Sequence, residues 1–542
     1  MQALAPEVSD VVSRTQAREI SDLTGHDVVV VGAGAAGGLA ADLLCEAGLK
    51  VLVLDAGWRD PFWKAPVKRL TSMSLSAMAT PDIMKIVPRR LLWKGEQLTR
   101  MIGRMRQPVQ TRCYAWPSAP EGFVDDKRHP YETPDGRPFD WIRVHGLGGR
   151  MVVPLHGRQY LRHGPADFAP ADGLTPPWPF APDDLERWYD LVEGRLGLSG
   201  GGDHSPHIPD SVTAHKLPLA PFEQAFAEQI RARHPGYEPI QGRFAAPITP
   251  LLAAARTGRL SCRTGAVVRH LQRDGEGRVT GVVFHDRATG SLQSVAAPMV
   301  FLCASSLEST RILMTTHAEH GGARKDADTD PLGRNLMDHA TIKVQGSAPA
   351  RDWGEVKDEQ GRCIYLPRFD TRNGNQSGRG FGVRVYHSHA AGGRSFFVAV
   401  ADGEMMPRAE NGVRLSGRSD ALGIPLLEIS CRHGPAELAL APEIGRALRE
   451  LTELCEVTPD QPIADVLEAP GSTIHECGTA RMGDDPATSV LNPVNEVWDM
   501  PGVRVTDGSC FPSQGIQNPT LTIMAITARA CDDAAKNAGR KG

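Results

Sequence analysis

Three glycines and an acidic residue near the start of the chain have the types and spacing of a dinucleotide site. The segment GAGAAG at 32–37 follows a β-branched run at 27–31 and opens a stretch of helical spacing at 35–48. A second apolar run at 50–54 ends at Asp55. In such a βαβ unit the glycines allow a tight turn and close approach of a pyrophosphate, while the terminal acid binds ribose hydroxyls. This pattern alone does not separate FAD from NAD. We expect the binding residues to be Gly32, Gly34, Ala36, Gly37 and Asp55.

The composition indicates a globular protein that binds small molecules. Of 542 residues, 41% are hydrophobic and 23% charged, so the chain can bury an interior and lacks the signature of disorder. Its length suggests two or three compact units. A formal charge of −4 leaves no overall basic excess for a phosphate backbone, so we do not expect nucleic acid as a partner.

We expect neither a targeting segment nor a metal site. Residues 1–26 carry charges without an apolar h-region, which predicts a cytoplasmic protein, and the apolar stretch 28–54 is interrupted by charges, which argues against a membrane span. The ten cysteines include no CxxC pair, so we interpret most of them as reduced core residues. His475-Glu476 resembles the start of a zinc-protease motif, but Thr479 stands where the second histidine is needed, so we predict no metal.

The middle of the chain contains the elements that must position such a site. Three strands are predicted at 260–271, 279–285 and 298–303, followed by an apolar helix at 306–314, which suggests that the first sheet resumes here. Alternating segments at 381–386, 395–400 and 426–432 are typical of an antiparallel sheet with one face covered, which we assign to a substrate domain. We also predict a helix at 183–196, a helix at 437–455, a strand at 503–507 and a helix at 520–536.

The C-terminal motifs resemble the signature of the glucose-methanol-choline (GMC) oxidoreductases. They are HECGTARMG at 475–483, VRVTDGSCFP at 503–512 and NPTLTI at 518–523. Further matches are Gly148-Gly149, GRNLMDH at 333–339, and 404–425. The order and spacing of these motifs agree with the family, and the resemblance covers nearly the whole chain from Asp27.

The resemblance implies an α/β fold, with a Rossmann-like FAD-binding domain and a second, α+β substrate domain built on an antiparallel sheet. The expected FAD domain combines 27–60, 135–165, 245–340 and 465–542. An N-terminal arm at 1–26 precedes it, and covering and substrate segments lie at 61–134, 166–244 and 341–464.

The resemblance also implies the roles of individual residues. His475 would accept the proton of a substrate hydroxyl while hydride passes to flavin N5, and Asn518 would be the paired hydrogen-bonding residue. Imidazole suits a base that works near neutral pH, and the electron sink is the cofactor. Besides the glycine-rich turn, the residues expected to contact FAD are Gly148, Gly149, Val268, Asp507, Gly508, Asn518 and Thr520.

Several departures from the family pattern refine these expectations. Some relatives attach FAD through a histidine shortly after the paired glycines, whereas here Arg150-Met-Val-Val153 follows them, which favours noncovalent FAD. Asp55 replaces the usual glutamate. No cysteine grouping suits an iron–sulfur cluster, so electrons leave directly from the flavin to oxygen, a quinone or another carrier.

The segment from His129 to Arg158 is similar to the branch of the family that acts on sugars and glycosides, although Pro154-Leu-His156 stands where a tryptophan is usual. We therefore expect a sugar, glycoside or amino sugar as the substrate. Two alternatives stay open at this point. One is oxidation of a non-sugar aryl or aliphatic alcohol, and the other is a flavin-binding protein without turnover.

Overall fold

The computed structural model describes most of the chain. The described residues are 24–58, 89–153, 159–168, 173, 175–201, 204–245, 250–321, 329–349, 362–370, 380–389 and 395–539. Residues 1–23 of the predicted arm at 1–26 and the segment Pro154–Arg158 lie outside them.

A parallel sheet forms the centre of the first half of the fold. Among the described residues it has five strands, in the order β18 (Val503–Val505), β10 (Val300–Leu302), β1 (Val28–Val31), β2 (Val51–Asp55) and β6 (Leu260–Thr264). The strands β1, β2, β10 and β18 are buried along their whole length, as expected when both faces of a parallel sheet are covered. The helices α2 (Ala35–Glu46), α9 (Leu251–Arg256) and α12 (Thr520–Gly539) contribute to the same apolar core.

One predicted strand is in fact two strands in different sheets. The segment 260–271 was expected to be continuous, but it divides at Gly265, which has φ +71°. The first part is β6, and the second, β7 (Ala266–Arg273), joins β8 (Val279–Asp286) and β9 (Ser291–Ala296) in an antiparallel sheet. The expectation that all of 260–303 returns to the first sheet is therefore wrong for 266–296. The left-handed backbone at Gly265 is what turns the chain from one sheet to the other.

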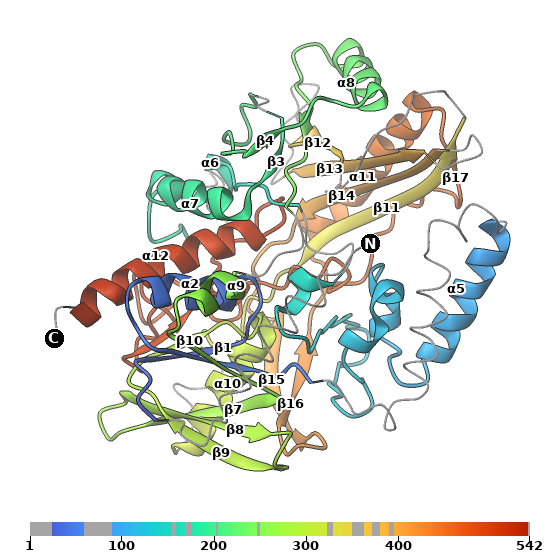
Figure 1. The fold of residues 1–542 in the computed structure, drawn as a ribbon. Coiled ribbons are helices and arrows are strands. Elements are labelled where there is room, and N and C mark those ends of the chain that lie inside the picture. The colour runs from blue at the N-terminus through green and yellow to red at the C-terminus, as the bar shows by residue number, and fades with distance from the viewer. Residues whose placement is uncertain are drawn as a thin grey trace.

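A six-stranded antiparallel sheet forms the second half among the described residues. Its order is β17 (Thr458–Pro459), β11 (His339–Ala348), β14 (Ser395–Glu404), β13 (Phe381–His389), β12 (Ile364–Leu366) and β5 (Ile240–Gln241). One face is apolar and packs on α11 (Pro435–Leu454) and α8 (Pro221–Arg233). Because side chains alternate along each strand, the polar residues between the apolar ones lie on the opposite face. Figure 1 shows this sheet in the upper part of the molecule, with the parallel sheet below it.

The alternating segment at 426–432 does not join this sheet. It forms β16 (Pro425–Ser430), which pairs with β15 (Gly412–Ser419) in a separate ribbon that contacts α10 (Ser306–Glu319). Alternation reports a half-buried strand but not its partner, so this assignment could not be made from the pattern alone. The helix α10 itself begins where it was predicted and continues to Glu319.

Three further α-helices and two short strands of the described part of the chain lie outside these sheets. They are α5 (Arg89–Gly103), α6 (Pro165–Phe168), α7 (Glu186–Leu196), and the short strands β3 (Ser199–Gly200) and β4 (His215–Lys216). Among the described residues no helix has the length and apolar character needed to cross a membrane. The domain boundaries proposed from the sequence stay a prediction.

Candidate functional site

The glycine-rich turn is held in place by a buried carboxylate. Gly32 has φ +92°, and a Cβ on Gly37 would lie 1.9 Å from the carbonyl oxygen of Gly32. Asp55 Oδ2 accepts the N–H of Ala33 at 2.8 Å, and Oδ1 accepts that of Gly57 at 2.7 Å. Burial raises the pKa of Asp55, and these two hydrogen bonds offset part of the rise. The residues predicted from the βαβ pattern therefore meet at one turn.

The residues present at this turn fit a pyrophosphate. A Cβ on Gly34 would meet nothing within 4 Å, so the backbone of Gly34 faces open space. No side chain caps the N-terminus of α2, and its first turn, which includes Ala36, carries no acidic residue. Such an end presents N–H groups and a positive partial charge to an anion. The Gly148-Gly149 turn lies against it, since a Cβ on Gly149 would be 3.0 Å from Gly34 Cα.

Val268 lies beside the same region, on β7. Its carbonyl oxygen accepts a hydrogen bond of 2.7 Å from Arg311, and its side chain is buried. The N–H of Gly265 donates to the carbonyl oxygen of Gly57 at 2.8 Å, which joins the start of β7 to the end of β2. This hydrogen bond thus holds together the strands that carry Asp55 and Val268.

Two C-terminal motifs pair with each other. The N–H groups of Gly478, Ala480 and Met482 donate to the carbonyl oxygens of Gly508, Ser509 and Cys510, respectively. Asp507, which precedes this segment, is buried and accepts the hydroxyls of Ser309 and Ser509. Burial raises the pKa of Asp507, and the serine hydroxyls offset part of the rise. A Cβ on Gly508 would lie 2.7 Å from the carbonyl oxygen of Glu476, so glycine is required there.

His475 and Asn518 lie side by side. Asn518 Nδ2 is 3.5 Å from His475 Nε2, and both side chains are half-buried. His339, the first residue of β11, places its ring edge-on to that of His475, with centroids 5.0 Å apart. Gln514 donates to the carbonyl oxygen of His475 at 2.9 Å. Thr520 begins α12 two residues after Asn518.

A buried carboxylate holds the loop that carries His475. Asp338 is fully buried and accepts the N–H of Gly471 at 2.7 Å and that of His475 at 3.2 Å. It also accepts the hydroxyl of Thr473. The loop needs such support because Ile474 has φ +66°, a conformation that costs a β-branched residue energy.

Arg150 connects this loop to the paired glycines. Its guanidinium donates to the carbonyl oxygen of Ile474 at 2.9 Å and lies 3.3 Å from Glu476 Oε2. Glu476 is buried, and burial raises its pKa, while Arg150 offsets part of the rise. A single side chain thus couples the Gly148-Gly149 turn to the residues on either side of His475.

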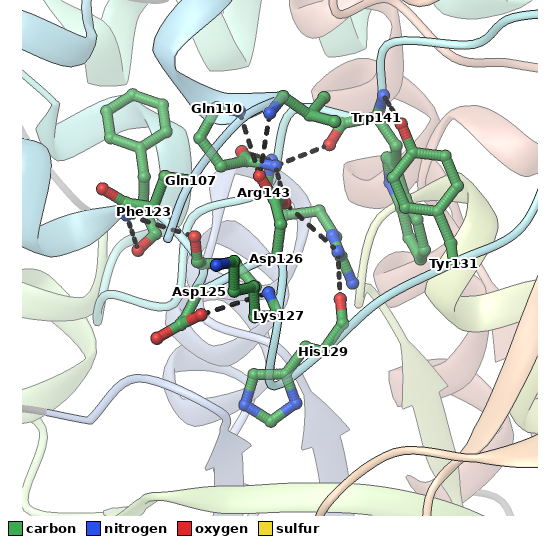
Figure 2. A network of polar contacts seen from close by, with 12 residues as sticks. Gln107, Gln110, Phe123, Asp125, Asp126, Lys127, His129, Tyr131, Trp141 and Arg143 are labelled. Carbon is green, nitrogen blue, oxygen red and sulfur yellow. Dashed lines mark hydrogen bonds and ion pairs between the residues drawn. The ribbon is translucent and has the colours of Figure 1, made fainter. Parts of the chain in front are cut away.

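A second support comes from the segment 107–143. Ile474 packs in a small apolar cluster with Trp116, Ile142 and Val153, and the N–H of Asp140 donates to the carbonyl oxygen of Pro470 at 2.9 Å. Figure 2 shows the polar network inside this segment. Gln110 contacts Asp126 at 2.7 Å, and accepts the N–H of Arg143 at 2.7 Å, while the Arg143 guanidinium donates to the carbonyl oxygen of His129.

The structure brings the predicted site residues into two neighbouring groups. One is the glycine-rich turn with Asp55, Gly148-Gly149 and Val268. The other is the C-terminal group of His475, Asp507, Gly508 and Asn518. Sequence reasoning missed the residues that hold these groups. Asp338 and His339 lay inside a recognised motif without a role, and Arg150 directly follows the paired glycines, but Gln514 and Ser309 gave no signal in the sequence.

Comparison with known proteins identifies the family that the chain resembles. The sequence profile described as GMC oxidoreductase matches residues 407–527. Paromamine 6'-oxidase of Streptomyces fradiae is 26% identical over 93% of this chain and 90% of its own length. The fructose dehydrogenase large subunit of Gluconobacter japonicus is 24% identical over 93% of this chain and 97% of its own length. Residues 407–527 thus match the GMC oxidoreductase family itself, and the chain resembles members of that family over nearly its whole length.

A solved structure supports the same fold. The crystal structure of pyridoxine 4-oxidase from Mesorbium loti matches 94% of this chain and 99% of its own length, with a TM-score of 0.60 and 20% identity. This likeness concerns the fold. The match to this family makes the chain an oxidoreductase and a flavoprotein, and the residues around Gly34 fit the phosphates of such a cofactor.

A pair of glycine substitutions separates cofactor binding from folding. Gly34→Ala places a methyl group in open space, so we expect loss of bound flavin but no change in the unfolding temperature of the flavin-free protein. Gly37→Ala drives Cβ into the backbone of Gly32, so we expect the free energy of unfolding to fall by about 3 kcal/mol or more. The flavin-to-protein absorbance ratio and thermal unfolding measure the two effects. Retention of flavin by the folded Gly34 variant would contradict the assignment of the phosphate site.

Asp338→Asn tests the support of the His475 loop. An asparagine side chain offers one oxygen to these donors, whereas the carboxylate offers two. We therefore expect the variant to lose about 1–3 kcal/mol in stability and to show slower reduction of flavin by substrate. Asp370→Asn is the matched control, because Asp370 is buried and accepts the N–H of Phe381 within the antiparallel sheet. If both variants slow flavin reduction equally in the folded fraction, Asp338 has no specific effect on His475.

Glu476→Gln should change the pH dependence of stability. Because burial raises the pKa of Glu476, the folded protein keeps this proton to a higher pH than the unfolded chain does. Stability from this group is present below the unfolded pKa of about 4.3 and is lost as the pH rises through the folded value. The glutamine variant lacks this loss, so its unfolding temperature relative to the parent should increase from pH 4 toward neutral pH. If the unfolding temperatures of the two proteins change with pH in parallel, the raised pKa of Glu476 is refuted.

Proposed function

We propose that this chain oxidises a CH–OH group of a sugar, glycoside or amino sugar, with His475 as the proton acceptor and noncovalently bound FAD. The observation that carries the proposal is the contact between His475 Nε2 and Asn518 Nδ2 next to a polar sheet face. The relatives named for oxidation of an aminoglycoside and of fructose support the substrate class.

The polar face of the antiparallel sheet supports a polyhydroxylated substrate. It carries His339 and Thr341 on β11, Asp402 and Glu404 on β14, and Arg384 on β13. Thr341 donates to Asp402 at 2.7 Å, and Arg384 forms an ion pair with the same carboxylate. Although burial alone would raise the pKa of Asp402, Arg384 holds it below its ordinary value.

This polar face contacts the loop that carries His475 and the segment that precedes Asn518. The N–H of Gly515, three residues before Asn518, donates to Glu404 at 3.2 Å, and His339 contacts the ring of His475. An apolar alcohol would place hydrocarbon against these polar groups and would add no hydrogen bond to those that they already make. Hydroxyls and amino groups can hydrogen-bond to these groups, which favours sugar-like substrates over aryl or aliphatic alcohols.

The chain's own residues prepare the proton transfer. Asp338 and Gln514 fix the backbone of His475 from both its N–H and its carbonyl oxygen, so the ring is held before substrate arrives. Asn518 offers an amide beside His475 Nε2, suited to orient the same hydroxyl oxygen that loses its proton to that nitrogen. The flavin, when bound, supplies the hydride acceptor.

A panel of alcohols tests this function. The purified protein is mixed anaerobically with glycosides, amino sugars, aryl alcohols and aliphatic alcohols, and the flavin absorbance is followed. We expect bleaching by a sugar-like substrate, and readmission of air then separates an oxidase from a dehydrogenase. Bleaching only by aryl or aliphatic alcohols would refute the substrate class, and a yellow protein that no alcohol bleaches would favour a flavin-binding protein without turnover.

Substitution of His475 tests the proton acceptor. His475→Ala should slow flavin reduction by about 10²–10⁴-fold, because general-base catalysis contributes that much, while leaving flavin content unchanged. His215→Ala, on the exposed strand β4, is the control and should keep the parent rate. An unchanged rate of flavin reduction in the His475 variant, measured by stopped-flow absorbance, would contradict the assignment of His475 as the proton acceptor.

A further inference from the structure

Half of the large hydrophobic side chains exposed in the described part of the chain lie within 17 residues. The exposed fractions are 54% for Leu98, 59% for Met101, 65% for Met105 and 57% for Tyr114. Leu98, Met101 and Met105 are spaced i, i+3 and i+7 along α5 and the turn that continues it, so they share one side of the helix. Figure 1 shows α5 at the edge of the molecule.

The orientation of α5 is the reverse of an ordinary surface helix, which buries its apolar side. The side packed on the protein holds small or polar residues. Thr99 is buried and donates to the carbonyl oxygen of Gly95, and a Cβ on Gly103 would lie 2.5 Å from the ring of Trp116. Arg100 donates to the carbonyl oxygens of Thr111 and Cys113 on the same side. The apolar side therefore faces outward although the helix is firmly attached.

Positive charge surrounds the apolar side. Lys94 precedes Leu98 by one helical turn and is exposed, as is Arg104 next to Met105. In residues 89–106 six basic residues stand against one acid, Glu96, in a chain whose formal charge is −4. Glu96 is itself paired with Arg100 at 2.9 Å. The basic residues are Arg89, Arg90, Lys94, Arg100, Arg104 and Arg106. Arg106 pairs with Asp125 and Arg100 faces the protein, so among the described side chains the exposed charges that flank the stripe are those of Lys94 and Arg104.

We propose that the outer side of α5 docks the protein on the surface of an anionic lipid bilayer. Helices that lie in the interface of a membrane combine an apolar side with flanking Lys and Arg, and bind through both buried area and attraction to anionic lipid. Leu98, Met101 and Met105 would enter the boundary between headgroups and acyl chains, with Lys94 and Arg104 at the phosphates. A nucleic acid would match the charge but leave the apolar stripe in water. This inference is independent of the proposed substrate.

Cosedimentation with lipid vesicles tests the docking. We expect the full-length protein to bind vesicles of phosphatidylglycerol and phosphatidylcholine more tightly than vesicles of phosphatidylcholine alone, and to dissociate as salt is added. The triple variant Leu98→Ser, Met101→Ser, Met105→Ser should lower the partition coefficient by about tenfold or more. The double variant Lys94→Glu, Arg104→Glu should lower binding to the anionic vesicles only.

The matched control removes equally exposed apolar side chains elsewhere. Leu438→Ser with Val466→Ser should leave vesicle binding at the parent level, since these residues are 57% and 70% exposed but lie outside α5. Thermal unfolding checks that every variant is folded. The proposal is overturned if the parent does not bind anionic vesicles, or if the control loses binding as the triple variant does. It is also overturned if sedimentation velocity shows a dimer of this chain that the triple variant abolishes, because the stripe would then be a contact between two copies.

Discussion

The candidate site depends on buried carboxylates whose oxygens are satisfied by the backbone of loops distant in sequence. Asp338 is the clearest case, because it collects the N–H groups of Gly471 and His475 more than 130 residues away. Asp55 accepts a backbone N–H group of the glycine-rich turn, whereas Asp507 accepts the side-chain hydroxyls of Ser309 and Ser509. A buried carboxylate is costly unless its oxygens are occupied, so each loop is tied to one arrangement.

The two sheets contribute different parts of the candidate site. The parallel sheet is buried on both faces and brings the ends of its strands to the glycine-rich turn, as open α/β sheets do. The antiparallel sheet buries one face on α11 and turns the polar one, with Asp402 and Arg384, toward the loop of His475. Arg150 and Gln514 connect the parts, because each contacts the backbone on one side of the His475 ring.

The helix α5 differs from the rest of the surface in the placement of its exposed apolar residues. Elsewhere, exposed large apolar residues are scattered, which is normal for a folded protein. On α5 they form a stripe, and the contacts to the rest of the protein come from Arg100 and from the close approach of Gly103 to Trp116, on the side where Thr99 is buried. Neither this helix nor the direction of its apolar side was predicted from the sequence.

The sequence by itself determined the βαβ unit at 28–55 and the resemblance to the GMC family, because each rests on local spacing or on a contiguous signature. It did not determine where a strand ends or which sheet it joins. The left-handed turn at Gly265 divides one apolar run between two sheets, and 425–430 pairs with 412–419 instead of the large sheet. Nor could it reveal the roles of Asp338, Gln514 and Ser309. Sheet partners and buried hydrogen bonds join residues far apart in the chain, so only the tertiary structure decides them.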